Sequence, residues 1–271
     1  MNEPFLEWAQ YVISQPSPPL VITTAYSDDE QTVPINYACR VCGDFMALGA
    51  RGVSLLFASG DHGVGRDPYC ISNDGSNNRT FIPQFPASCP YVTAVGATKD
   101  FTPEVAAYNP QTGFASGGGF SNYFIQPEFQ IPAVKSYLSI LGNGSQALFN
   151  RQGRAYPDIS AQGSNFVSIW NGKLILKEGT TAAAATAAAV FALVSDARLR
   201  NGQRPLGFLN PLLYGGLGGA FNDVRSGSAV GCGVKGFEAV VGWDPVSGWG
   251  TPVGISCSLF FRVDEANDFP S

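Results

Sequence analysis

The sequence KEGTT at residues 177–181 runs directly into the segment AAAATAAAVFALV at residues 182–194. This second segment is apolar on nearly every face, which predicts a helix buried on all sides at the centre of an α/β domain. Its start gathers unpaired backbone N–H groups and the positive end of the helix dipole. Thr181 at that position is either an ordinary N-cap residue or the place where a hydrolytic enzyme would hold a nucleophile.

The composition favours one compact α/β domain. The chain has 271 residues, of which 45% are hydrophobic and 14% charged, enough apolar side chains for a sizeable core. The net charge is −5 without a basic cluster, which argues against nucleic acid and anionic membranes as partners. Apolar runs stop short of the ~18 residues that a membrane span needs. We expect a monomer, with a domain over residues 1–257 and a tail over 258–271.

The low charge density, the low isoelectric point and two glycosylation sequons suggest a secreted protein or one of an acidic compartment. We expect Cys70 and Cys89 to form a disulfide because they flank a polar loop, and Cys39 and Cys42 to be buried thiols inside a helix. Asn-x-Ser/Thr sequons begin at Asn78 and Asn143. Residues 1–4 lead straight into a helical pattern without a secretion signal, which favours either a fragment or a late-starting reading frame.

Hydrophobic periodicity predicts alternating strands and helices, and therefore a parallel sheet with right-handed crossovers. Loops at the carboxyl ends of such strands carry ligands and chemistry. The Gly-rich loop 59–65, which contains Asp61 and the chain's one histidine, His62, follows such a strand. Asn171-Gly172 predicts the turn of a hairpin over 166–175. The expected strands are 20–26, 53–58 and 91–97, and the expected helices are 5–13, 27–50, 132–141 and 182–194.

Motifs in a fixed order resemble one peptidase family. The chain is similar to the sedolisins, or serine-carboxyl peptidases, and above all to their fungal tripeptidyl-peptidase branch, over residues 2 to about 254. This resemblance implies a subtilisin-like α/β fold, a parallel sheet with helices on both faces, here lacking the N-terminal strands. The motifs are NEPFLEW (2–8), LGARGV (48–53), FASGD (57–61), FPASCPYV (85–92), SGGGFS (116–121), GRAYPD (153–158), PLGFLNP (205–211) and GWDPV (242–246).

The resemblance assigns catalytic roles at two positions. Asp61 matches the acid of the oxyanion hole, which donates a hydrogen bond when it is protonated. Thr181 stands where the family has its nucleophilic serine, and the extra methyl group of threonine restricts its χ1 angle. The family usually carries Ser, Thr and Pro where this chain has alanines at 183–185. His62 departs from the usual serine, and we interpret it as an incidental loop residue rather than a general base.

The family's catalytic Glu and Asp are expected upstream of the segment at which this chain begins. Glu3 and Glu7 have the same spacing, but in family order they belong to the next helix, so we interpret them as surface charges. The resemblance also implies a substrate-binding edge at Ala25, Tyr26 and Ser27, where the alternative is an ordinary strand end.

The resemblance further implies one Ca²⁺ ion near the C-terminus. Carboxylates and backbone carbonyls in Gly-rich turns are suitable hard ligands for this ion. Asp223 and Asp244 would supply carboxylates, and Val224, Val240 and Gly242 would supply carbonyl oxygens.

The functions implied are acidic proteolysis and release of tripeptides from peptide N-termini, with peptides or proteins as substrates. We expect hydrolysis to be impaired in this chain, because Thr181 replaces the nucleophilic serine and the catalytic Glu and Asp are missing. The alternatives are a non-catalytic, calcium-binding homologue that binds peptides or a partner, and a fragment of an active peptidase.

Overall fold

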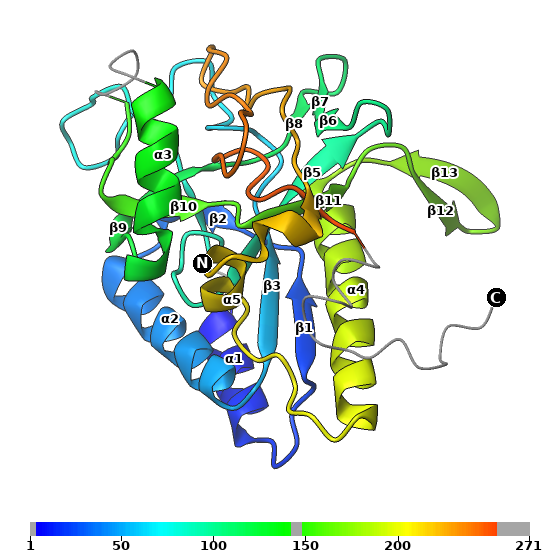
Figure 1. Cartoon of the computed structure of the whole chain (residues 1–271). Helices are drawn as coiled ribbons and strands as arrows, with labels where there is room; N and C mark the ends of the chain where they lie inside the picture. Colours follow the sequence, from blue (N-terminus) through cyan, green and yellow to red (C-terminus); the bar gives the residue numbers. More distant parts are fainter. Residues whose placement is uncertain (1–3, 142–147, 254–271) are drawn as a thin grey trace.

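The structure is a computed structural model that describes residues 4–141 and 148–253. Its centre is a parallel sheet with the strand order β1-β3-β5-β11 (Figure 1). Its strands are β1 (Val21–Thr24), β3 (Ser54–Ala58), β5 (Thr93–Lys99) and β11 (Ile159–Gln162), with β6 (Val105–Ala106) antiparallel to β5. The predicted parallel sheet is therefore confirmed. The fourth strand was not predicted, because its four residues show no distinctive apolar pattern.

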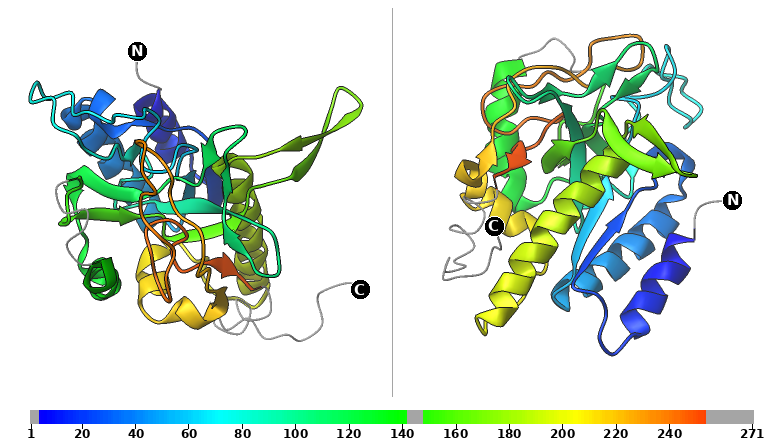
Figure 2. Two further views of the ribbon diagram at one scale, coloured as in Figure 1. Left: turned by 90° about the horizontal axis from the view of Figure 1, so that it is seen from above. Right: turned by 90° about the vertical axis from the view of Figure 1, so that its right-hand side faces the viewer.

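Helices cover both faces of this sheet, as predicted (Figures 1 and 2). On one face lie α1 (Phe5–Ser14) and α2 (Ile35–Ala50), and Phe57 of β3 packs between Phe5 of α1 and Phe45 of α2. On the other face lies α4 (Thr180–Arg200), which packs across all four parallel strands. The α-helices and the sheet therefore form the layered core expected of a subtilisin-like fold.

The remaining elements surround this core. A second apolar cluster joins α3 (Ile131–Leu141) to the loops near residues 81 and 237. Besides α3, the elements outside the central sheet and its covering helices are β2 (Asp28–Asp29), η1 (Glu30–Thr32), β4 (Gln84–Phe85), β7 (Tyr108–Asn109), β8 (Phe114–Ala115), β9 (Gly119–Ile125), η2 (Glu128–Gln130), β10 (Gly153–Tyr156), β12 (Phe166–Trp170), β13 (Lys173–Lys177), α5 (Asn210–Tyr214), η3 (Leu217–Ala220), β14 (Phe221–Asn222) and β15 (Thr251–Pro252).

The predicted start of α2 is wrong. The acidic run that was expected to begin the helix instead forms β2 and η1, and the helix begins at Ile35, directly after Pro34. Proline has no N–H and suits the start of a helix rather than its interior.

The prediction that α4 is buried on all sides is also wrong. One face packs on the sheet through Phe191 and several alanines, but Leu193 on the opposite side is 61% exposed. Alanine tolerates burial and exposure alike, so an alanine-rich helix shows no polar stripe that would mark its outer face. By length and composition α4 is the one described helix that could cross a membrane, yet here it is the core helix of an α/β layer.

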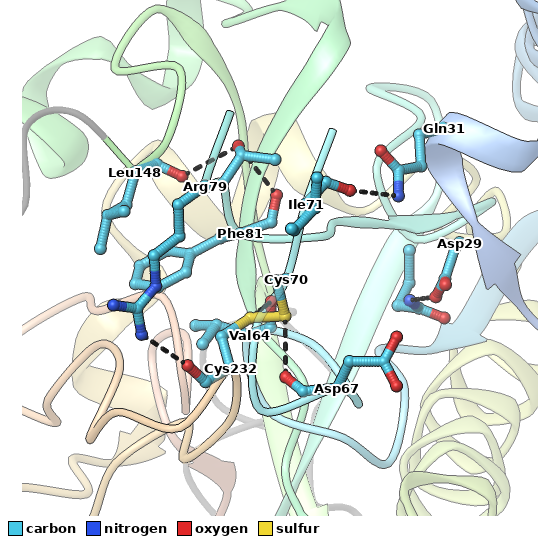
Figure 3. The surroundings of a disulfide bond; sticks show 12 residues. Asp29, Gln31, Val64, Asp67, Cys70, Ile71, Arg79, Phe81, Leu148 and Cys232 are labelled. Carbon is cyan, nitrogen blue, oxygen red and sulfur yellow. Dashed lines mark hydrogen bonds between the residues drawn. A yellow bond between two sulfur atoms is a disulfide. The ribbon is translucent and has the colours of Figure 1, made fainter. Parts of the chain in front are cut away.

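The cysteine predictions fail because the pairing follows the fold rather than the spacing. Cys89 bonds to Cys42 of α2, and Cys70 bonds to Cys232, 162 residues further along (Figure 3). Cys39 is exposed, so Cys39 and Cys42 are not a pair of buried thiols. Cys257 and the predicted tail, residues 258–271, lie outside the described residues.

Candidate active site

The site forms where the loop after β3 meets the start of α4. Asp61, three residues beyond β3, lies beside Thr180, the first residue of α4, although 119 residues separate them. The Oδ1 atom of Asp61 accepts hydrogen bonds from the backbone N and the Oγ1 of Thr180, at 2.8 Å each. The Gly60 N–H donates to the same Oγ1 at 3.1 Å. Asp61 thus satisfies an unpaired amide at the positive end of α4.

Thr181 is not the N-cap residue of α4. Gly179 holds that position, and Thr181 is the second residue of the helix. Its side chain is exposed, whereas that of Thr180 is buried. Within the described ranges no atom hydrogen-bonds to the Oγ1 of Thr181. The plain capping interpretation is therefore wrong, and the hydroxyl group is free to meet a ligand.

Gly179 allows the side chains of Asp61 and Thr181 to approach one another. Its φ of 151° lies in a region that residues with a side chain rarely adopt. A Cβ atom on residue 179 would lie 2.8 Å from the Oγ1 of Thr181 and 3.2 Å from the Oδ2 of Asp61. The space beside Gly179 therefore lies between the hydroxyl group of Thr181 and the carboxyl group of Asp61.

The predicted substrate-binding edge lies beside this loop. Ala25 and Tyr26 are exposed and follow β1, the strand next to β3. The Ser27 hydroxyl donates to the Oε1 of Gln84 at 3.2 Å, and a Cβ on Gly60 would meet the side chain of Gln84 at 2.9 Å. Residues 25–27 therefore stand at the same edge of the sheet as Asp61. Substrate binding by these three residues stays a prediction.

The side chain of His62 contacts Arg66 rather than Thr181. Its Nε2 lies 2.7 Å from a guanidinium nitrogen of Arg66. Arginine can only donate, so this nitrogen of His62 is an unprotonated acceptor. Partial burial, with the Arg66 charge as a second cause, lowers the pKa of His62 below its usual value. No contact in the described residues makes His62 a base for Thr181.

The glycines at 117 and 118 bring the backbone close to the site loop. The Gly117 N–H donates to the Gly60 carbonyl at 2.8 Å. A Cβ on residue 117 would lie 2.5 Å from the Ser59 carbonyl oxygen, and one on residue 118 would lie 1.9 Å from that of Pro245. The absence of side chains at 117 and 118 therefore allows this close backbone approach.

Glu178 holds the turn before Thr181 in place and was not predicted. Its carboxylate accepts hydrogen bonds from Asn109 Nδ2 at 3.0 Å and from the Thr112 hydroxyl. The next residue, Gly179, donates its N–H to the Gly163 carbonyl at 2.9 Å. These contacts join the β7–β8 turn to the start of α4. Asn109 and Thr112 lie 69 and 66 residues from Glu178 in the sequence, so no local pattern could reveal these contacts.

The five predicted calcium ligands lie in one group of loops. Gly242 N lies 3.2 Å from both carboxylate oxygens of Asp223, and Val240 N donates to Asp244 at 3.0 Å. The Ser247 hydroxyl contacts both Asp244 and the Val224 carbonyl. Among the described residues no group of three or more His, Cys, Asp or Glu could hold a metal ion. A cation here would therefore depend on backbone oxygens as well as the two carboxylates.

The charges of this group fit a hard cation in part. Asp244 is fully buried, and burial raises its pKa to about 7. In the described ranges no cationic side chain contacts it, so a bound cation would favour its ionised form. Asp223 already pairs with Arg225 at 2.8 Å, in a partly exposed ion pair. Calcium binding stays a prediction.

Comparisons with known proteins agree with this fold. The Subtilase family (Peptidase_S8) matches residues 12–204. Tripeptidyl-peptidase SED2 of Arthroderma otae is 43% identical over 93% of this chain, and tripeptidyl-peptidase sed4 of Aspergillus fumigatus is 42% identical over 93%. The chain spans only 44% and 45% of those two proteins.

Solved structures confirm the fold. Pseudomonas sedolisin, a serine-carboxyl proteinase, superposes with a TM-score of 0.72 and 24% identity, covering 96% of this chain and 68% of that one. The prenylagaramide maturation protease PagA superposes with a TM-score of 0.54 and 14% identity. The chain therefore belongs to the subtilase family. Within that family it fits the sedolisin-type tripeptidyl-peptidases, the branch that the motif order predicted.

Proposed function

We propose that this chain is a sedolisin-type serine-carboxyl peptidase homologue that retains a peptide-binding site and hydrolyses peptides poorly. The observation that carries this proposal is the placement of Asp61 and Thr181 on either side of Gly179. The tripeptidyl-peptidases that it resembles support a peptide as the ligand. The family activity would be acidic proteolysis with release of N-terminal tripeptides.

The retained Asp61 supports binding of a peptide carbonyl. In acidic solution a protonated carboxyl group can donate to a carbonyl oxygen, and this donor would stabilise negative charge developing on that oxygen. Its Oδ1 is already held by Thr180, which leaves Oδ2 on the side of Gly179. Thr180 and Gly60 thus orient Asp61 without ligand.

The side chain of Thr181 and its surroundings support the proposal that hydrolysis is impaired. A hydroxyl nucleophile needs a base within hydrogen-bond reach, and in the described ranges the Oγ1 of Thr181 has none. Its methyl group also limits χ1 and crowds the approach of a carbonyl carbon. A second candidate, an active peptidase of the same type, is favoured by the exposed hydroxyl group of Thr181 and by the placement of Asp61.

We also propose a Ca²⁺ ion at Asp223 and Asp244, with carbonyl oxygens of Val224, Val240 and Gly242. The ion would link three loops near the C-terminal end of the described chain. A secreted or acidic location and a monomeric state complete the proposal. The disulfides Cys42–Cys89 and Cys70–Cys232 support an oxidising compartment.

The deciding experiment measures tripeptide release by the protein expressed from its complete reading frame, at acidic and at neutral pH. We expect Thr181→Ser to hydrolyse at least about 100-fold faster than the wild type, roughly 2.7 kcal/mol of activation free energy. Thr181→Ala should have no activity. Wild-type hydrolysis that Thr181→Ala abolishes and Thr181→Ser does not increase would establish the active peptidase instead. Peptide binding without hydrolysis in all three variants would establish a purely non-catalytic homologue.

A further inference from the structure

The β12–β13 hairpin exposes apolar side chains on both of its strands. It projects from the body of the molecule beside the start of α4 (Figures 1 and 2). Asn171 and Gly172, both with positive φ, form the predicted two-residue turn, so the hairpin prediction is confirmed. The exposed fractions are 60% for Val167, 79% for Ile169, 69% for Leu174 and 57% for Leu176.

These four side chains lie on one face of the hairpin. Val167 is paired with Leu176 and Ile169 with Leu174. Directly paired residues share a face of a sheet, and so do residues two apart along a strand. The result is an uninterrupted aliphatic surface, which we call the aliphatic face. A two-stranded hairpin with such a face gains little stability until something covers it.

The opposite face carries both lysines of β13, beside aromatic side chains of β12. Lys177 is paired with Phe166 and Lys173 with Trp170, so both lysines of β13 point to this side. No Asp or Glu occurs from residue 159 to residue 177. The two faces of the hairpin therefore differ: one carries only aliphatic side chains, and the other carries Lys173 and Lys177 together with Phe166, Trp170 and Ile175.

The hairpin is open to a third strand. Among the described residues β12 and β13 form a sheet of two strands, so their outer edges carry unpaired backbone groups. Such edges bind extended peptides by strand addition, in which main-chain bonds give affinity and alternate side chains give specificity. β13 ends at Lys177, only two residues before Gly179, so its edge runs directly to the candidate site.

We propose that the outer edge of β13 binds an extended peptide in which apolar and acidic residues alternate. As a third strand, the peptide would extend the aliphatic face with its apolar side chains. Its acidic side chains would then lie beside Lys173 and Lys177. This inference rests on the proposed peptide-binding function and names the class of peptide that the site would take.

The test uses fluorescence anisotropy of two labelled eight-residue peptides with the full chain. One peptide alternates valine and glutamate, and the other contains four valines followed by four glutamates. The variant Ile169→Thr with Leu174→Thr removes aliphatic surface while keeping good strand formers. The matched control, Ile125→Thr with Ile140→Thr, changes two exposed isoleucines outside the hairpin. A third variant, Lys173→Gln with Lys177→Gln, removes the charges, and thermal melting verifies folding of each protein.

We expect the alternating peptide to bind at least about tenfold more tightly than the block peptide. The hairpin variant and the lysine variant should each lose at least about tenfold in affinity, and the control should not change. Equal affinity for both peptides, or full affinity in the hairpin variant, would overturn the proposal. Concentration-dependent dimers that the Ile169 and Leu174 changes abolish would instead assign the aliphatic face to a second copy of the chain. Because no hydrolysis is measured, the outcome is separate from that of the tripeptide-release assay.

Discussion

Asp61 caps helix α4 through Thr180, because one carboxylate oxygen accepts hydrogen bonds from both the backbone N and the hydroxyl group of that residue at 2.8 Å. The same carboxyl group has a proposed chemical role in the oxyanion hole. A single side chain therefore couples the stability of the central helix to the geometry of the site, and substitutions at Asp61 can separate these two contributions.

Asp61→Ala should lower the free energy of unfolding by about 1–2 kcal/mol, the usual cost of losing a helix cap. The melting temperature should fall by roughly 2–4 °C for each kcal/mol. Asp61→Asn keeps an oxygen that can accept both hydrogen bonds, so it should cost less than about 0.5 kcal/mol while still removing the acidic proton. Calorimetric melting of both variants provides the measurement. Equal losses in both would show that the negative charge stabilises the helix rather than the hydrogen bonds.

Gly179→Ala should destabilise the protein by about 1–3 kcal/mol, because the backbone at 179 is in a conformation open almost only to glycine. The new methyl group would also lie 2.8 Å from the Oγ1 of Thr181. Gly43→Ala is a suitable control, since this residue lies within α2 and a Cβ there meets no atom within 4 Å. It should stabilise the protein by about 0.5–1 kcal/mol. Urea unfolding measures both, and a neutral Gly179→Ala would refute the proposed strain.

Breaking the buried ion pair between Arg154 and Asp158 should lower the free energy of unfolding more than the changes at Asp61 or Gly179. Asp158 accepts from Arg154 at 2.6 Å and from the Ala94 N–H at 2.7 Å, and both side chains of the ion pair are fully buried. Asp158→Asn leaves the guanidinium without its counter-charge, which should cost about 3–5 kcal/mol. Asp196→Asn breaks the exposed pair with Arg200 and should cost less than about 1 kcal/mol. Denaturant unfolding of both variants checks the contrast, which similar losses would contradict.

The central layers could be predicted from sequence, whereas contacts between distant loops could not. Apolar periodicity is set by local geometry, so it located α1, α3 and three of the four parallel strands. The disulfide prediction failed because Cys89 meets Cys42 only after α2 packs on the sheet. At the candidate site, motif order pointed to Asp61 and Thr181, which the structure brings together beside Gly179. The Glu178 contacts with the β7–β8 turn depend on tertiary packing, and no spacing rule indicates them.

Calcium removal tests the proposed metal site. If Ca²⁺ binds only the folded protein, a free concentration of 100 times Kd should raise stability by about 2.7 kcal/mol, and chelator should reverse this. Asp223→Asn should abolish most of the response, because it removes the charge of one carboxylate while keeping its size. Asp74→Asn, in an exposed turn, should leave the response unchanged. Melting with and without chelator is the measurement, and a wild-type protein that does not respond would eliminate the site.

The raised pKa of the buried Glu30 carboxyl group should make the free energy of unfolding depend on pH. The carboxylate is fully buried and accepts hydrogen bonds from the Ser121 hydroxyl and from the Asn122 N–H at 2.7 Å. Burial is the largest effect and raises its pKa above the ordinary value of 4.5, although the Ser121 hydrogen bond opposes this. The folded state therefore keeps this proton to a higher pH than the unfolded state does. Between the two pKa values, the contribution of Glu30 to stability falls as the pH rises.

Glu30→Gln removes this titration while keeping a side chain of similar size. The stability of the wild type relative to the variant should therefore be greatest below pH 4.5, the ordinary pKa, and should decrease as the pH rises toward the raised pKa of the folded protein. Urea unfolding of both proteins from acidic to neutral pH measures the difference. Glu238→Gln, at an exposed side chain, controls for the substitution itself and should change stability by less than about 0.5 kcal/mol. A difference between wild type and Glu30→Gln that grows with pH would mean that hydrogen bonds to the ionised carboxylate outweigh the cost of its burial.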